Sequence, residues 1–157
     1  MRIAVVGDTH GIVGFAMDKL QSIKEFDLLL HLGDYCRDAE KISDKLNVKT
    51  ITVKGNGDLD SKYNEDELIE VGDKKIFMTH GHRYGVHRNL NKLYYKGLEL
   101  GADIILYGHT HVPLILEEDG ISIMNPGSPT NPRGNNPKLT FGIIEIEENI
   151  KLSIVEI

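Results

Sequence analysis

Polar residues that can bind metal ions gather in five short clusters along this 157-residue chain. Each cluster follows a short apolar run of the kind that forms a β-strand. Because ligands of α/β sheets bind beyond the carboxyl ends of the strands, we expect all five clusters to converge on one cleft. One Asp-x-His pair alone would be a weak signal, but five clusters in this order favour a metal site. They are Gly7-Asp8-Thr9-His10, His31-Leu32-Gly33-Asp34, Gly55-Asn56-Gly57-Asp58, Thr79-His80-Gly81-His82 and Gly108-His109-Thr110-His111.

Glycines and residue spacing suggest how these side chains reach one cavity. A glycine occurs in every cluster, where it lets the backbone turn sharply off a strand or lets a ligand approach closely. In extended backbone, residues i and i+2 project to the same side. We therefore expect Asp8 and His10 to face the cavity together, and likewise His109 and His111.

The elements that must position the clusters alternate strands with helices over the first two thirds of the chain. A helix over residues 13–26 should place Phe15, Leu20 and Ile23 on one face. The continuous run Leu28-Leu29-Leu30 indicates a strand that is buried on both faces. In full, strands are predicted over residues 2–6, 27–32, 49–53, 68–71, 75–79 and 103–107, and helices over residues 13–26, 38–46 and 86–100, the last ending at Gly101.

The last third of the chain has the pattern of antiparallel β-structure. Residues 114–117 and 121–124 flank Asp119-Gly120, which is a hairpin signal. Residues 139–147 and 150–157 form a second expected pair of strands, and residues 125–137 an ordered loop. These elements predict an α/β fold with two mixed β-sheets packed face to face and helices outside. The length fits a single domain over residues 1–157.

Composition excludes several classes of protein. The formal net charge of −6 argues against binding long nucleic acids, which requires clustered Lys and Arg. One cysteine, Cys36, rules out a disulfide framework or a thiolate metal cage and suits a reducing compartment. No apolar run reaches the ~18–20 residues of a membrane span, and the first residues lack a signal-peptide layout. We expect a cytoplasmic protein that does not associate with membranes.

The five motifs resemble those of the calcineurin-like metallophosphoesterases. That family's pattern is Asp-x-His, Gly-Asp, Gly-Asn-His-Asp/Glu, a Gly- or His-flanked His, and Gly-His-x-His. The resemblance covers residues 1 to about 133 and includes the loop Asn125-Pro126-Gly127-Ser128. The chain is most similar in length to the family's small single-domain branch, the YfcE-like phosphodiesterases. The resemblance implies a four-layer α/β/β/α sandwich.

The resemblance also implies a centre of two divalent transition-metal ions. Two carboxylates and a bridging hydroxide would leave one net positive charge to meet an anionic phosphodiester. The histidine-rich donor set favours Mn or Ni, with Fe, Co and Zn also suitable. Carried over by position, the first ion would be held by Asp8, His10 and His111, the second by Asn56, His80 and His109, and Asp34 would bridge them.

Three further residues are candidates for a part in catalysis. His82 either donates a proton to the leaving group or supports the rim of the site. Asp58 either orients a proton donor or caps its loop, and Arg133 either clamps a phosphate oxygen or is simply exposed. Gly57 stands where many family members have a histidine that assists catalysis, so the identity of any general acid is open. His31 lies in an apolar run and reads as a core or supporting histidine.

These features predict a binuclear metal-dependent phosphodiesterase in which a metal-bridging hydroxide attacks phosphorus in line. Its substrate would be a small phosphodiester. Two alternatives are a phosphomonoesterase or small phosphatase, and a non-catalytic interaction module similar to the retromer subunit of this fold. The intact ligand set favours an enzyme. The substrate's identity, the native metal pair and the formation of a homo-oligomer stay undetermined at this level.

Overall fold

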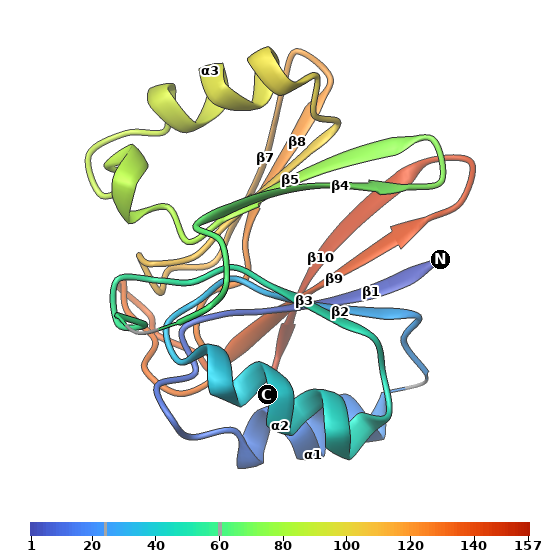
Figure 1. The fold of residues 1–157 in the computed structure, drawn as a ribbon, viewed down its shortest axis with the longest axis vertical. Helices are drawn as coiled ribbons and strands as arrows, with labels where there is room; N and C mark the ends of the chain where they lie inside the picture. Colours follow the sequence, from blue (N-terminus) through green and yellow to red (C-terminus); the bar gives the residue numbers. More distant parts are fainter. Residues whose placement is uncertain (24, 60) are drawn as a thin grey trace.

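A computed structural model describes residues 1–23, 25–59 and 61–157. Its strands form two mixed five-stranded sheets (Figure 1). The first sheet contains β1 (Arg2–Val6), β2 (Leu28–His31), β3 (Thr50–Thr52), β9 (Thr140–Ile146) and β10 (Ile150–Glu156). The second contains β4 (Asp66–Val71), β5 (Lys74–Thr79), β6 (Ile104–Tyr107), β7 (Leu114–Glu118) and β8 (Ile121–Asn125). The strand orders are β10-β9-β1-β2-β3 and β4-β5-β6-β8-β7.

Helices cover the outer faces of the two sheets. The helices α1 (Gly14–Ser22) and α2 (Cys36–Leu46) lie against the first sheet, and α3 (Asn91–Leu100) lies against the second (Figure 1). A short 3₁₀ helix, η1 (His82–Tyr84), precedes α3. The order of layers is therefore helix, sheet, sheet, helix, which confirms the predicted fold class.

Alternating side chains along the strands build these layers. Leu28 and Leu30 of β2 share a fully buried core with Ile76 and other residues of the second sheet. Leu29, between them, faces the opposite way and packs with Ile42 of α2. The prediction that this apolar run is buried on both faces is confirmed. All predicted strands are present, with ends that differ by two residues at most.

The first helix is shorter than predicted and presents a different face to the core. It ends at Ser22 rather than residue 26, and residue 24 lies outside the described residues. Ala16 and Leu20, four residues apart, are the buried positions. Phe15 is 59% exposed, so its expected place on the buried face is wrong.

The third helix also begins later than predicted, at Asn91 instead of residue 86. The side chain of Asn89 accepts a hydrogen bond from the backbone N–H of Asn91 at 3.1 Å, which helps to start the helix there. Val86 is buried through packing in the outer core of the second sheet and not through a helical face. Gly101 ends the helix at a positive φ of 65°, as predicted. None of the described helices has both the length and the apolar character needed to cross a bilayer.

Candidate metal centre

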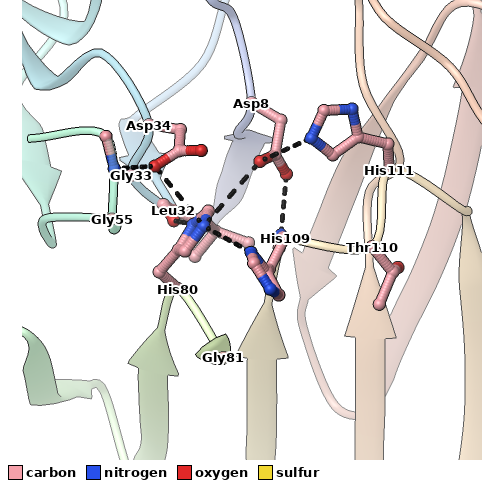
Figure 2. A network of polar contacts seen from close by, with 12 residues as sticks. Asp8, Leu32, Gly33, Asp34, Gly55, His80, Gly81, His109, Thr110 and His111 are labelled. Carbon is pink, nitrogen blue, oxygen red and sulfur yellow. Dashed lines mark hydrogen bonds and ion pairs between the residues drawn. The ribbon is translucent and has the colours of Figure 1, made fainter. Parts of the chain in front are cut away.

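Loops that follow four strands bring five of the predicted ligands together at one end of the sheets (Figure 2). Asp8 follows β1, Asp34 follows β2, His80 follows β5, and His109 and His111 follow β6. His111 Nε2 lies 3.2 Å from Asp8 Oδ1, and His80 Nε2 lies 3.5 Å from Asp34 Oδ1. The backbone N–H of His109 donates to Asp8 Oδ2 at 2.9 Å. These side chains therefore share one site although they are distant in sequence.

The ligand atoms form two adjacent groups. In each of the groups Asp8–His10–His111 and Asp8–Asp34–His80, one atom per residue lies within 4.8 Å of the others. The carboxylate of Asp34 faces both histidine sets. Its Oδ1 is 3.5 Å from His80 Nε2, and its Oδ2 is 3.9 Å from His10 Nε2. Asp34 thus faces histidines of both groups, and Asp8 belongs to both.

Backbone carbonyl groups determine which ring nitrogens face the centre. His80 Nδ1 lies 2.8 Å from the carbonyl oxygen of Leu32, and His111 Nδ1 lies 2.6 Å from that of Asn131. A carbonyl oxygen can only accept, so each Nδ1 carries a proton. In the neutral rings, the Nε2 lone pairs are then directed into the site, as in histidines that ligate metals.

With these tautomers, two hydrogen-bond acceptors face one another at the centre. In the neutral His111 ring, Nε2 lies 3.2 Å from Asp8 Oδ1, and His10 Nε2 lies 3.3 Å from the same His111 nitrogen. Among the described residues, the fully buried Asp8 Oδ1 has no hydrogen-bond donor. Such an arrangement is costly unless a cation lies between the acceptors. The donor set therefore fits a divalent metal ion.

The protonation states also suit metal binding. Burial alone would raise the pKa of Asp8, but the nearby His111 and His80 outweigh it and lower that pKa below its usual value. Burial, together with His80 and His87, lowers the pKa of His109 to about 4. Burial also acts to lower the pKa of His111, yet its contact with Asp8 outweighs this and raises that pKa. At neutral pH the centre thus has an ionised carboxylate and a neutral His109, which are the forms that bind metals.

The backbone at the centre adopts an uncommon conformation. Side-chain-bearing residues with positive φ are rare and cluster at functional sites, because left-handed backbone costs about 1–2 kcal/mol per residue. Asp8 and His10 have φ of 54° and 47°, and His109 and His111 have φ of 69° and 58°. The expectation that extended backbone points each pair into the cavity is therefore wrong: tight left-handed turns do so. Asp34 shares this conformation, with φ of 54°.

Two glycines permit close approach to the carboxylates, as the sequence predicts. A Cβ atom at Gly108 would lie 2.8 Å from Asp8 Oδ2. A Cβ atom at Gly55 would overlap Asp34 Oδ1. Any larger residue at either position would displace a carboxylate from the centre.

Asn56 lies at the rim of this centre. Its side chain is exposed, and it is flanked by Gly55 and Gly57, both of which approach Asp34. The backbone N–H of Gly57 donates to Asp34 Oδ1 at 2.8 Å. Among the described residues, the Asn56 carboxamide has no hydrogen bond with the other candidate ligands. That Asn56 binds a metal ion therefore stays a prediction.

The carboxylate of Asp58 connects its own loop to the start of α2 by hydrogen bonds. Its Oδ1 accepts hydrogen bonds from the backbone N–H groups of Tyr35 and Cys36 at 2.9 and 2.8 Å, and its Oδ2 accepts one from Gly55 at 2.9 Å. Burial acts to raise the pKa of Asp58, but these donors outweigh it and lower the pKa. The structure thus gives Asp58 the contacts of a residue that caps its loop.

Three basic residues lie next to candidate ligands. The ring of His82 lies 5.4 Å from that of His80, and burial lowers the pKa of His82. The backbone N–H of Arg133 donates to the carbonyl of His111 at 3.1 Å, and its side chain is exposed. The ring of His87 lies 4.6 Å from the ring of His109. Sequence reasoning missed His87, because nothing in its spacing separates it from an exposed helical residue.

A buried chain of hydrogen bonds lies behind the centre. His31 Nδ1 accepts from the backbone N–H of Gly33 at 3.3 Å, so its Nε2 carries the proton and donates to Thr9 Oγ1 at 3.3 Å. Thr9 Oγ1 in turn donates to Asp38 Oδ2 at 2.8 Å. Burial lowers the pKa of His31 to about 4, which keeps this ring neutral. His31 therefore has the contacts of a supporting histidine.

The loop that follows β8 supports the centre from the other side. Ser128 is fully buried, and its hydroxyl donates to the carbonyl of Asp8 at 2.8 Å. Thr130 Oγ1 donates to the carbonyl of Thr9 at 3.1 Å. Together with the bond between His111 and Asn131, these contacts tie the predicted ordered loop to two candidate ligands.

Relatives of the chain agree with this geometry. The calcineurin-like phosphoesterase superfamily domain matches residues 1–149. The chain is 32% identical to the probable metallophosphoesterase YsnB of Bacillus subtilis. The alignment spans 154 residues and covers 95% of this chain and 86% of YsnB. It is 31% identical to the phosphodiesterase YfcE of Escherichia coli. That alignment spans 128 residues and covers 73% of this chain and 62% of YfcE.

Solved structures show the same fold. A predicted phosphoesterase from Streptococcus pneumoniae matches with a TM-score of 0.85 and 32% identity, covering 99% of this chain and 88% of that one. Vps29 from Entamoeba histolytica, solved in complex with zinc, matches with a TM-score of 0.81 and 26% identity over 99% of each chain. Since the family match spans nearly the whole sequence and the centre has the donor set of a metal site, the chain belongs to the calcineurin-like phosphoesterase superfamily, a family of metal-dependent phosphoesterases.

Proposed function

We propose that the chain is a phosphodiesterase whose centre holds two divalent transition-metal ions. The observation that carries this proposal is the position of Asp34, whose two carboxylate oxygens face His80 and His10 respectively. When bound, two such ions lower the pKa of the attacking water and stabilise the attacking and leaving oxygens of an in-line displacement at phosphorus. Mn and Ni are our favoured metals for the imidazole and carboxylate donors, which also suit Fe, Co and Zn.

Each of the predicted ligands has a place in this proposal. His80 and His111 present Nε2 lone pairs because backbone carbonyls hold their Nδ1 protons. Asn56 lies on the loop that contacts Asp34 through Gly57. The proposed ligands are Asp8, His10 and His111 for one ion and Asn56, His80 and His109 for the other, with Asp34 shared.

The remaining residues orient these ligands. Asp58 holds the Asn56 loop against the start of α2 through the backbone N–H groups of Tyr35 and Cys36, and it also accepts a hydrogen bond from the N–H of Gly55 within the loop. Ser128 fixes the backbone of Asp8. Supporting contacts of this kind keep ligands in one geometry before the substrate arrives. We propose a cytoplasmic location, in keeping with the single, buried Cys36.

A second candidate function is a non-catalytic interaction module. The observation in its favour is the similarity to Vps29, at a TM-score of 0.81. The clustered donors of Asp8, His10 and His111 fit the phosphodiesterase, but Vps29 also binds zinc, so turnover rather than metal binding separates the two functions. A surface that only binds a partner protein would not require several potential metal ligands to adopt left-handed backbone, which costs free energy.

Hydrolysis of bis(4-nitrophenyl) phosphate and of 4-nitrophenyl phosphate tests this proposal. We expect chelation to abolish turnover of the diester, and reloading with Mn²⁺ or Ni²⁺ to restore it. The value of kcat/KM for the diester should exceed that for the monoester by about 10-fold or more. Preference for the monoester would indicate a phosphomonoesterase. A folded, metal-loaded protein with no turnover of either ester would indicate the interaction module.

A further inference from the structure

A hollow of about 430 Å³ lies beside the candidate metal centre. Its size falls within the range of about 300–1,000 Å³ that is typical of small-molecule sites. A larger hollow of about 630 Å³, lined by Leu20 and Leu46 among others, contains none of the candidate metal ligands. The lining of the hollow beside the centre includes Val86, His87, Thr110, Val112, Leu114 and Arg133.

This hollow adjoins the candidate metal centre through its lining residues. Thr110 stands between the candidate ligands His109 and His111 in the chain. The ring of His87 lies 4.6 Å from that of His109, and the backbone of Arg133 is bonded to the carbonyl of His111. A phosphodiester held at the centre would therefore have room for one of its two ester arms in the hollow.

The walls of the hollow suit an apolar group that carries a few polar atoms. Val86 is buried, whereas Val112 and Leu114 are 39% and 36% exposed, which leaves apolar surface available next to a polar site. Thr110 Oγ1 accepts hydrogen bonds from Asn125 Nδ2 at 3.0 Å and from the backbone N–H of Val112 at 3.3 Å. Both bonds use its lone pairs, so the hydroxyl proton can be donated to a ligand.

The charged group in the hollow favours a flat ring. The guanidinium of Arg133 is planar and stacks on aromatic rings as well as bonding to anions. An apolar wall, one hydroxyl donor and a planar cation match a heteroaromatic base. They match a glycerol or choline arm less well, since glycerol lacks a ring face and choline would meet the positive charge of Arg133.

We propose that the hollow binds the nucleobase of a nucleoside phosphodiester, with the phosphate at the metal centre. This inference rests on the proposed function and narrows its substrate class. The base packs against Val112 and Leu114, Arg133 stacks on it, and Thr110 donates to an acceptor on its edge. The other ester arm points away from the hollow.

Direct binding to the metal-loaded protein tests this inference without requiring turnover. AMP and ribose 5-phosphate share the sugar and the phosphate and differ only in the base. By isothermal titration calorimetry, AMP should bind about 10-fold more tightly than ribose 5-phosphate, as expected for one stacked base. In Leu114→Ser the ratio of the two dissociation constants should fall to about 2 or less.

Ile115→Ser is the matched control. Ile115 is the next residue of the same strand and is 41% exposed, but it does not line the hollow. This variant should keep the wild-type ratio, and melting curves should show that both variants are folded.

The inference is overturned if wild-type protein binds AMP and ribose 5-phosphate equally, or binds neither. It is also overturned if Leu114→Ser keeps the full ratio. Absence of diester hydrolysis in the metal-loaded protein would instead reject the proposed function, so the two failures are distinguishable.

Discussion

Asp34→Asn should lower kcat/KM for an aryl phosphodiester by more than about 100-fold, since even residues outside the metal coordination typically cost about 10–100-fold. The substitution keeps an oxygen that can accept the hydrogen bond from Gly57, but it removes the charge that faces both His80 and His10. Two neighbouring cations repel one another, and a shared carboxylate offsets that repulsion. Loss of this charge should therefore weaken the binding of both ions.

His31→Gln is the control for this variant. His31 lies just before Asp34 in the chain, but its ring contacts Thr9 and Gly33 rather than the candidate metal ligands. We expect it to lose about 10-fold at most. Asp34→Asn should also keep the metal-free protein folded, because it removes one of two neighbouring carboxylates in the Asp8–Asp34–His80 group. Full activity in Asp34→Asn together with an inactive, folded and metal-loaded His31→Gln would reverse the two assignments.

The rate of hydrolysis should depend steeply on the leaving group. Gly57 has no side chain that could donate a proton, and burial lowers the pKa of His82. A correctly placed proton donor contributes about 10²–10⁴-fold. Without one, the departing oxygen must carry nearly its full charge. A plot of log(kcat/KM) against leaving-group pKa for aryl diesters should fall steeply, and alkyl esters should react slowly.

Gly57→His should make this plot shallower. Gly57 is not among the residues with positive φ, so a side chain is compatible with its backbone. A Cβ atom there would lie 3.1 Å from Asp34 Oδ1, which demands a small shift of that carboxylate. Gly57→Ala introduces the same Cβ without the imidazole and is the matched control, with metal content measured in both. A shallow plot for the wild type, with chemistry rate-limiting, would show that another group donates the proton, and His82 would be the first residue to replace.

Much of the fold could be predicted because its strands have simple patterns. The run Leu28-Leu29-Leu30 indicates a strand between two apolar layers, and the structure places it there. Helix ends were less predictable, since they depend on local hydrogen bonds and tertiary packing. Val86 extends the helical pattern of the following residues, yet it is buried by contacts with the second sheet, and the helix begins only at Asn91.

The gathering of the candidate ligands was predictable, whereas their geometry was not. Asp8 and His10 are marked by type and spacing, but their positive φ angles come from the turn that follows β1. The proton on His111 Nδ1 depends on the carbonyl of Asn131, which is distant in sequence. The contact between His87 and His109 depends likewise on tertiary packing. Spacing alone contains no information on such contacts.

The number of metal ions bound per chain tests the central claim most directly. Elemental analysis of protein loaded with Mn²⁺ or Ni²⁺ and freed of excess metal should find close to two ions per chain, since the ligand atoms form two groups that share Asp8 and are joined by Asp34. Asp34→Asn should lower this number. One ion per chain in fully active protein, or none after loading, would contradict a binuclear centre.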